Sequence, residues 1–247
     1  MDFPLLSAIA FLPVIGSLLI FVLPNRTRET ARTIALAVTI LSFVLSMYML
    51  FAFDHNDQFQ FTEHATWLTG LGASYHLGVD GLGVLLVALT TLIGIIAVIW
   101  SWNTIKVRAP EYYMTLLLLQ TGMLGVFMAL DLFVFYIFWE IMLIPMALLI
   151  GVWGSQNRVY AAIKFFLFTL AGSLLTFLGL LTLVLWDYQH NGEHTLRFSI
   201  PALTQGLAAH PLPPGWQTVV FLALFAGFAI KVPLFPLHTW LPLAHVQ

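Results

Sequence analysis

Long apolar runs with few or no charged residues dominate this chain, and short polar segments separate them. A helix of about 20 apolar residues is long enough to cross about 30 Å of lipid hydrocarbon. Because lipid offers no hydrogen bonds to the backbone, we expect each run to form a helix. The predicted fold class is therefore an all-α polytopic membrane protein with about seven transmembrane helices. The predicted spans are 4–23, 33–53, 82–100, 112–130, 132–151, 160–185 and 217–232.

The composition supports this class. Only 8% of the 247 residues are charged and 60% are hydrophobic, whereas about 25% of the residues in an average soluble domain are charged. The net charge of −2, without a basic cluster, predicts no nucleic-acid partner. The chain contains no cysteine, which excludes disulfide scaffolds, iron–sulfur ligation and thiolate zinc sites.

The connections between the runs alternate in charge. Lysine and arginine are concentrated on the cytoplasmic side of membrane proteins, so the odd-numbered connections are expected to be cytoplasmic and the N-terminus outside. The longer outside connections are 54–81 and 186–216, and a proline-rich part of the second predicts an extended turn region. The odd-numbered connections hold six basic residues, Arg26, Arg28, Arg32, Lys106, Arg108 and Arg158, and the even-numbered ones hold only Arg197.

Glu140 lies inside the fifth run, about 12 Å from its outer edge at the rise of a helix. A carboxylate at this depth costs about 2.5–3.5 kcal/mol even on the most lenient insertion scale. Such residues usually face the bundle interior, pair with another polar group and mark ion or proton paths. The alternative is a neutral, hydrogen-bonded glutamate that only fastens helices together.

Lys164 lies at a similar predicted depth in the next run, which crosses the membrane in the opposite direction. Its ammonium is therefore a candidate partner for the Glu140 carboxylate, because an opposite charge nearby favours the ionised form of both groups. The alternative is that the long side chain extends to the cytoplasmic interface and keeps its charge in water.

Lys231 ends a charge-free stretch and opens a segment that contains Pro233, Pro236 and Pro242. Prolines at this density cannot continue a regular helix. A broken helix at membrane depth is tolerated only where it is buried in protein or lines a wet cavity. We therefore expect the freed carbonyls to hydrogen-bond the Lys231 ammonium, in a site where a lysine can gain and lose a proton. The alternative is a lysine that caps the helix C-terminus.

His238 follows two of these prolines. The imidazole of histidine titrates near physiological pH, so this side chain is a candidate proton relay. The alternative is a histidine that only satisfies a hydrogen bond in a polar kink. No arrangement of histidines and carboxylates predicts a metal site, and His245 has no predicted partner.

Three segments resemble one family, the proton-translocating membrane subunits of respiratory complex I, and within it the NADH–quinone oxidoreductase chain M (chain 4) group. The resemblance covers the whole chain, with one departure at Leu243, where many relatives carry aspartate. The segments are Gly78-Val-Asp80-Gly81, Phe138-Trp-Glu140-Ile-Met-Leu-Ile-Pro145-Met-Ala-Leu-Leu-Ile-Gly151-Val-Trp153-Gly154, and Ala229-Ile-Lys231-Val-Pro-Leu-Phe-Pro-Leu-His238-Thr-Trp240-Leu-Pro242.

The resemblance implies an antiporter-like fold of 14 helices, of which this chain would be the N-terminal part. It divides the chain into two domains. Residues 1–111 would contain helices 1–3 and the outside loop 54–81, and residues 112–247 would form a first half-channel. Glu140 and Lys231 would be the proton-handling pair, Lys164 a partner of the glutamate, and His238 a possible relay towards the central axis.

The resemblance also implies what surrounds the chain. It would hold no cofactor itself, while NADH, FMN, iron–sulfur clusters and quinone would be bound by other subunits. Its partners would be the antiporter-like chains L and N, and its place the bacterial inner membrane. Two alternatives share this half-channel, a subunit of an Mrp-type cation/proton antiporter and a subunit of a membrane-bound hydrogenase. A third is a lipid-embedded scaffold without a transport role.

Overall fold

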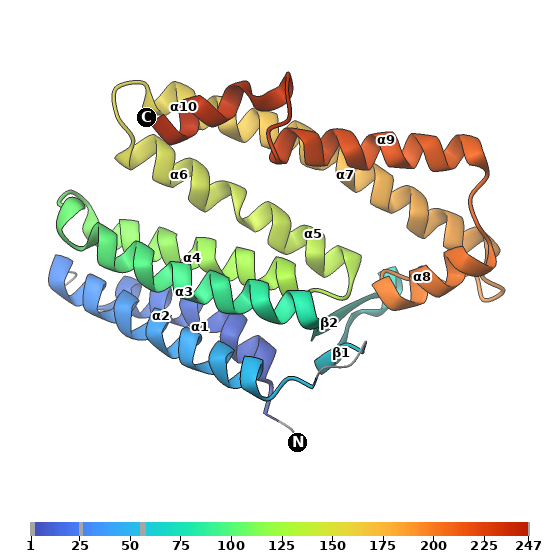
Figure 1. The fold of residues 1–247 in the computed structure, drawn as a ribbon, viewed down its shortest axis with the longest axis horizontal. Coiled ribbons are helices and arrows are strands. Elements are labelled where there is room, and N and C mark those ends of the chain that lie inside the picture. Colours follow the sequence, from blue (N-terminus) through green and yellow to red (C-terminus); the bar gives the residue numbers. More distant parts are fainter. Residues whose placement is uncertain (1–2, 25–26, 55–57, 247) are drawn as a thin grey trace. The chain divides into compact units, whose positions relative to one another are not determined.

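The computed structural model describes residues 3–24, 27–54 and 58–246, and the side chains up to residue 244 (Figure 1). Arg26, which contributes to the charge pattern, lies outside the described residues, and so does the side chain of His245. The chain folds into two compact units. The first unit comprises Met1–His64 and His76–Ala129, and the second comprises Ala65–Tyr75 and Leu130–Gln247.

Four helices form the first unit, and they lie side by side in Figure 1. Their core contains Tyr113 and Leu117 of α4, which are fully buried against Val98 of α3 and Ala35 of α2. Large and small apolar side chains alternate in this core and pack closely, and this close packing stabilises the four helices against one another. The helices are α1 (Leu5–Val22), α2 (Arg28–Phe51), α3 (Gly81–Thr104) and α4 (Ala109–Met128).

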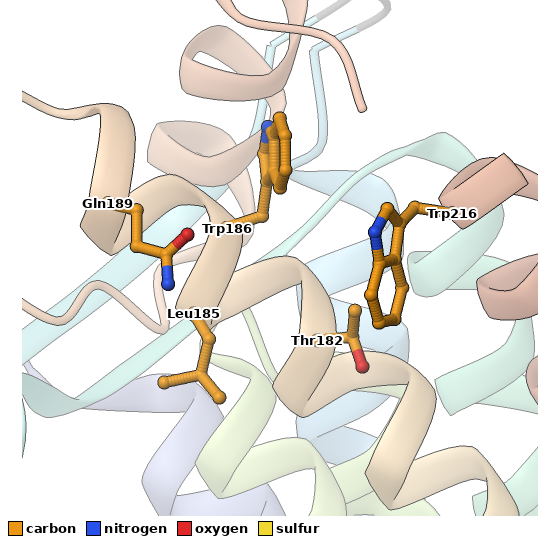
Figure 2. Close-up of a pocket in the computed structure, with 5 residues that line it drawn as sticks. All are labelled: Thr182, Leu185, Trp186, Gln189 and Trp216. Atoms are coloured by element: carbon orange, nitrogen blue, oxygen red, sulfur yellow. The ribbon is translucent and has the colours of Figure 1, made fainter. Parts of the chain in front are cut away.

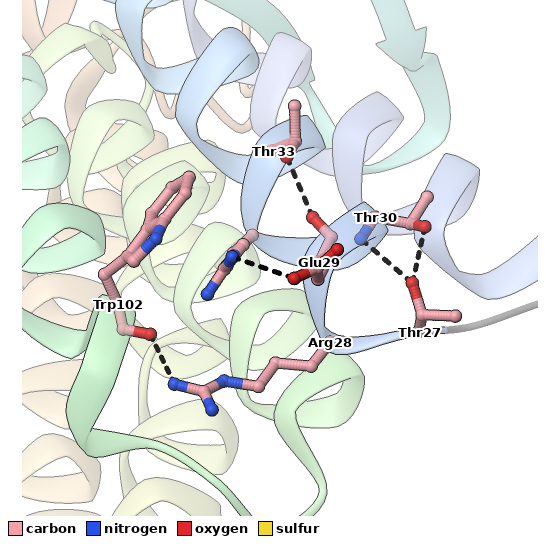
Figure 3. Close-up of polar contacts among 7 residues, drawn as sticks. Thr27, Arg28, Glu29, Thr30, Thr33 and Trp102 are labelled. Atoms are coloured by element: carbon pink, nitrogen blue, oxygen red, sulfur yellow. Dashed lines mark hydrogen bonds and ion pairs between the residues drawn. The ribbon is translucent and has the colours of Figure 1, made fainter.

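Polar contacts define the start of α2 (Figure 3). The Thr27 hydroxyl accepts a hydrogen bond from the Thr30 N–H over 3.1 Å, as an N-cap residue does. Arg28 donates to the Trp102 carbonyl near the end of α3 over 2.6 Å, and the Arg32 guanidinium lies 4.5 Å from the centre of the Trp102 ring. Arg28 and Arg32, in the first turns of α2, therefore lie at the same end of the first unit as the α3–α4 connection, as the predicted alternation of charge requires.

A two-stranded sheet occupies the first long connection, where the sequence predicted only a loop. Its strands are β1 (Gln60–Leu68) and β2 (Ala73–Val79), joined through the short 3-10 helix η1 (Thr69–Leu71). The Glu63 carboxylate on β1 accepts hydrogen bonds from the backbone N–H of Leu6, over 2.6 Å, and of Ser7. These N–H groups have no partner inside α1, so Glu63 caps that helix from the strand.

The second unit is built around α7 (Arg158–His190), which contacts all the helices that follow Asp131 in this unit. Helices α7 and α9 run side by side in Figure 1. They approach closely at Gly227, where an added Cβ would lie 2.0 Å from Thr176 Oγ1 and 2.6 Å from the Gly172 carbonyl oxygen. The other elements are α5 (Leu132–Ile141), α6 (Leu143–Trp153), α8 (Ile200–Ala209), α9 (Pro214–Lys231), η2 (Leu237–Trp240) and α10 (Leu241–Val246).

A fully buried carboxylate starts α5. Asp131 accepts hydrogen bonds from the N–H groups of Phe133 and Val134, over 2.9 and 3.3 Å, and thereby caps the helix. Its other oxygen accepts from the N–H and hydroxyl of Ser74 in β2, over 3.0 and 3.1 Å. Four donors surround this one group, so the buried charge is compensated. Asp131 thus fixes the helix that carries Glu140.

Six helices in the described residues are long and apolar enough to cross a membrane, and the chain is a multi-pass membrane protein. The predicted span 112–130 forms α4, which is not among the six because Glu111, Gln120 and other polar residues lower its hydropathy. The count of seven spans is therefore not confirmed. The proline-rich part of the connection 186–216 forms the predicted extended turn between α8 and α9, with Pro213 at φ −57° and ψ 150°. The rest of this connection contains the end of α7 and all of α8.

Candidate functional site

Two helix interruptions lie close together in the second unit. The first separates α5 from α6 at Met142, two residues after Glu140. It arises because Pro145 has no N–H to donate to the Ile141 carbonyl. The second follows Lys231, where α9 ends and only short helical segments continue the chain. The predicted break in the seventh span is confirmed, and it places an ammonium at the end of a membrane-spanning helix.

Lys231 is held by Trp139. The ammonium nitrogen lies 3.9 Å from the centre of the indole ring and donates a hydrogen bond of 3.5 Å to the Trp139 carbonyl. A cation within about 6 Å of an aromatic ring centre is attracted by the negative potential of the ring face, and tryptophan is the strongest such partner. The side chain is half-buried, so this attraction acts in a partly desolvated site.

The carbonyls freed by the break have other donors. The Ile230 carbonyl accepts from the indole N–H of Trp240 over 2.8 Å, and the Ala229 carbonyl accepts from the Leu234 N–H, also over 2.8 Å. The Lys231 ammonium therefore donates its hydrogen bond to a carbonyl of α5, that of Trp139, and not to a carbonyl at the end of α9. This differs from the sequence-based expectation, because Trp240 folds back over the break and occupies the carbonyl there.

Glu140 is half-buried, and its Oε1 atom is buried without a hydrogen-bond partner in the described structure. Glu140 directly follows Trp139, whose carbonyl accepts the hydrogen bond from the Lys231 ammonium, and it lies one turn after Tyr136 in α5. No ion pair of 4.0 Å or less joins the described side chains of Glu140 and Lys231. The structure thus brings the carboxylate and the ammonium near each other without direct contact.

Lys164 lies on α7, where its ammonium is 6.0 Å from the ring centre of Tyr160 and 5.8 Å from that of Phe168. Both rings belong to its own helix, and the described residues show no ion pair of Lys164 with Glu140. Its role as a partner of the glutamate stays a prediction.

His238 lies in η2, seven residues after Lys231. Its ring stacks on Phe235 at a centroid distance of 5.6 Å, and its Nδ1 atom is buried without a partner in the described structure. A buried imidazole nitrogen that lacks a partner can accept or donate a proton once water or a neighbouring group reaches it. The relay role of His238 stays a prediction.

Sequence reasoning missed Trp139 and Trp240, although both lie in the segments that it quoted. Tryptophans of membrane proteins gather at span ends, where they form an aromatic belt. Trp139 lies eight residues inside its span and directly beside a carboxylate, which is far from either interface. This position was the available signal that its ring has a role inside the protein.

A surface pocket of about 260 Å³ opens near the other end of α7, and Figure 2 shows its lining. No residue that lines it is charged, so it cannot supply the acid–base groups that proton transfer needs. Glu140 and Lys231 take no part in it, and the charge-bearing site remains the region around Trp139. The lining residues are Thr182, Leu185, Trp186, Gln189 and Trp216.

Residues 129–247, which include Glu140, Lys164, Lys231 and His238, match a family model described as "NADH:quinone oxidoreductase/Mrp antiporter, TM". This part of the chain is thus similar to that family. The family match begins two residues before Asp131, so it covers the helices that form the candidate site.

Relatives of the family match the whole chain. NADH-quinone oxidoreductase subunit M from Rhodobacter capsulatus is 41% identical over 249 residues, which cover 98% of this chain and 48% of the relative. The chain spans about half the length of the relatives that it matches.

Solved structures of the family share the fold. A chain in the structure of respiratory complex I from Thermus thermophilus with bound NADH is 33% identical, with a TM-score of 0.78. The match covers 97% of this chain and 46% of that chain. A chain of the Mrp complex from Dietzia sp. has a TM-score of 0.77 over 98% of this chain and 25% of its own, but at 22% identity it shows the fold alone.

Proposed function

We propose that the chain is a proton-translocating membrane subunit of an NADH–quinone oxidoreductase of the subunit M type, in which Glu140 and Lys231 handle the proton. One observation carries the proposal: an ammonium and a carboxylate lie near each other at two helix breaks inside a membrane-spanning unit. Ionisable residues at such positions generally mark proton or ion paths. The names of the relatives at 35–41% identity support the assignment to this enzyme.

The electrostatic coupling of the two groups is large enough to move a proton. At an effective dielectric constant of about 20, unit charges about 4 to 8 Å apart interact by about 2 to 4 kcal/mol. Protonation of Glu140 removes that stabilisation from the Lys231 ammonium, which favours release of its proton. Ionisation of Glu140 favours reloading. A change of charge or distance elsewhere in the assembly could drive this cycle through Glu140.

The remaining parts of the proposal concern the surroundings of the chain. We propose that it holds no redox cofactor and that other subunits bind NADH, FMN, iron–sulfur clusters and quinone. Its neighbours would be the antiporter-like chains L and N of a bacterial inner membrane complex. Lys164 would assist Glu140 from α7, and His238 would pass protons onward from Lys231.

An Mrp-type cation/proton antiporter is the second candidate, because the family description names both groups. The relatives with the higher identities are named as oxidoreductase subunits, which favours the first candidate. Purification from native membranes separates the two. Co-purification with an NADH-oxidising activity supports the oxidoreductase, and purification with cation/proton exchange activity alone supports the antiporter.

Glu140→Gln tests the role of the site, because it keeps the size and polarity of the side chain and removes the charge. The full-length variant is assembled in native membranes, and NADH-driven proton uptake into vesicles is measured beside NADH oxidation. We expect uptake to be lost while the complex remains assembled. Glu193→Gln is the control, since Glu193 is exposed and pairs with Arg197. Normal uptake in Glu140→Gln would refute the proposal and favour a scaffold.

A further inference from the structure

We infer that Trp139 is a positioning residue that holds the Lys231 ammonium apart from Glu140 and so keeps the pair open for proton exchange. The inference rests on the proposed function. Trp139 supplies two contacts to one ammonium, the ring face at 3.9 Å from its centre and the carbonyl oxygen at 3.5 Å. The second is at the long limit of a hydrogen bond, so the ring supplies the stronger attraction.

The ring is held in this orientation by aromatic neighbours on two helices. Phe135 of α5 lies 5.4 Å away between ring centres, and Phe228 of α9 lies 5.7 Å away at an interplanar angle of 90°. The indole N–H of Trp139 is buried without a hydrogen-bond partner in the described structure. Hydrogen bonding of that N–H therefore does not explain the position of the ring, whereas its contacts with Phe135, Phe228 and Lys231 do.

Glu140 is the competing partner for the ammonium. It follows Trp139 in the same helix, and its Oε1 atom is buried and has no partner in the described structure. A buried carboxylate and ammonium in direct contact bind each other strongly, and such a pair resists any change of charge on either member. Because the ring attracts the ammonium whether or not Glu140 is ionised, it keeps Lys231 in place when Glu140 changes its charge.

This role predicts a dependence on the ring face. A desolvated cation–π contact with tryptophan corresponds to a factor of about 30 in an equilibrium between two positions of the ammonium. Trp139→Leu removes the face and keeps an apolar side chain, and Trp139→Phe keeps a weaker face. In the assembled complex we expect Trp139→Leu to lower NADH-driven proton uptake by about 10- to 30-fold, with Trp139→Phe between it and the unmodified protein.

Phe133→Leu is the matched control. Phe133 is an aromatic residue of the same helix, and its ring contacts those of Trp67 and Phe198. The aromatic ring that the Lys231 ammonium contacts in the described structure is that of Trp139. We expect this variant to keep normal uptake. A loss equal to that of Trp139→Leu would overturn the inference, because it would show that any aromatic residue of α5 is needed for packing alone.

Tryptophan analogues with one, two or three fluorine atoms, incorporated at position 139, separate the electrostatic effect of the ring from its effect on packing. Fluorine weakens the negative potential of the ring with little change of volume, so uptake should fall stepwise with each fluorine. A merely structural role would leave the three analogues equal, and that result would overturn the inference even if Trp139→Leu fails to assemble.

Lys231→Met distinguishes failure of the inference from failure of the proposed function. If Lys231→Met abolishes uptake and the fluorinated series shows no trend, the role of Trp139 is wrong and the proposed function stands. If Lys231→Met keeps normal uptake in an assembled complex, the proposed function is wrong, and with it the inference.

Discussion

Gly227 is the position where a single methyl group should disturb both the packing and the site. A Cβ at this position would lie 2.6 Å from the carbonyl oxygen of Gly172 and 2.0 Å from Thr176 Oγ1. The hydroxyl of Thr176 can rotate, but the backbone carbonyl cannot. To reach ordinary van der Waals contact, α9 must move away from α7 by somewhat less than about 1 Å, and such overpacking costs about 1 to 3 kcal/mol.

The displacement reaches the functional site because Lys231 follows Gly227 by one helical turn. We expect Gly227→Ala to lower the midpoint of thermal unfolding of the purified complex by about 2 to 12 °C, at about 2 to 4 °C per kcal/mol for a chain of this size. Proton uptake at permissive temperature should also fall, because the ammonium moves relative to the ring of Trp139.

Gly215→Ala is the control for this experiment. It lies on the same helix, and an added Cβ there meets no atom within 4 Å. Its unfolding midpoint should therefore equal that of the unmodified protein or rise slightly, since alanine is the better helix former. If Gly227→Ala is as stable and as active as Gly215→Ala, the close approach of α7 and α9 does not position Lys231 and the reasoning fails.

Two further substitutions test the caps of the second unit. Asp131→Asn should destabilise it by about 1 to 3 kcal/mol, because an amide nitrogen cannot accept the two hydrogen bonds from Ser74; a thermal midpoint equal to that of the unmodified protein would contradict this. Trp240→Phe keeps an aromatic ring beside Phe165 but leaves the Ile230 carbonyl without its donor. The free energy of unfolding should therefore fall by about 1 to 3 kcal/mol. An unchanged thermal midpoint would show that this hydrogen bond does not stabilise the end of α9.

The membrane-spanning helices were predictable because each is encoded locally. An apolar run of sufficient length must satisfy its own backbone in lipid, and that requirement depends on no other part of the chain. The end of α9 was predictable for the same reason, since the prolines after Lys231 prevent a helix wherever they occur. The β1–β2 hairpin was missed because its acidic and polar residues suggest a solvated loop, whereas Glu63 in fact caps α1.

The sequence by itself determined that a carboxylate and a lysine lie in apolar helices long enough to span a membrane, because length and composition can be counted along the chain. Only the tertiary structure decided what each of them contacts. Lys231 binds Trp139, which lies 92 residues earlier in the chain. The Ile230 carbonyl, at the end of α9, accepts its hydrogen bond from the indole N–H of Trp240. Contacts between residues so far apart depend on how α9 packs on α7 and meets Trp139 of α5. The pattern of a single helix contains no information about the helix that it will contact.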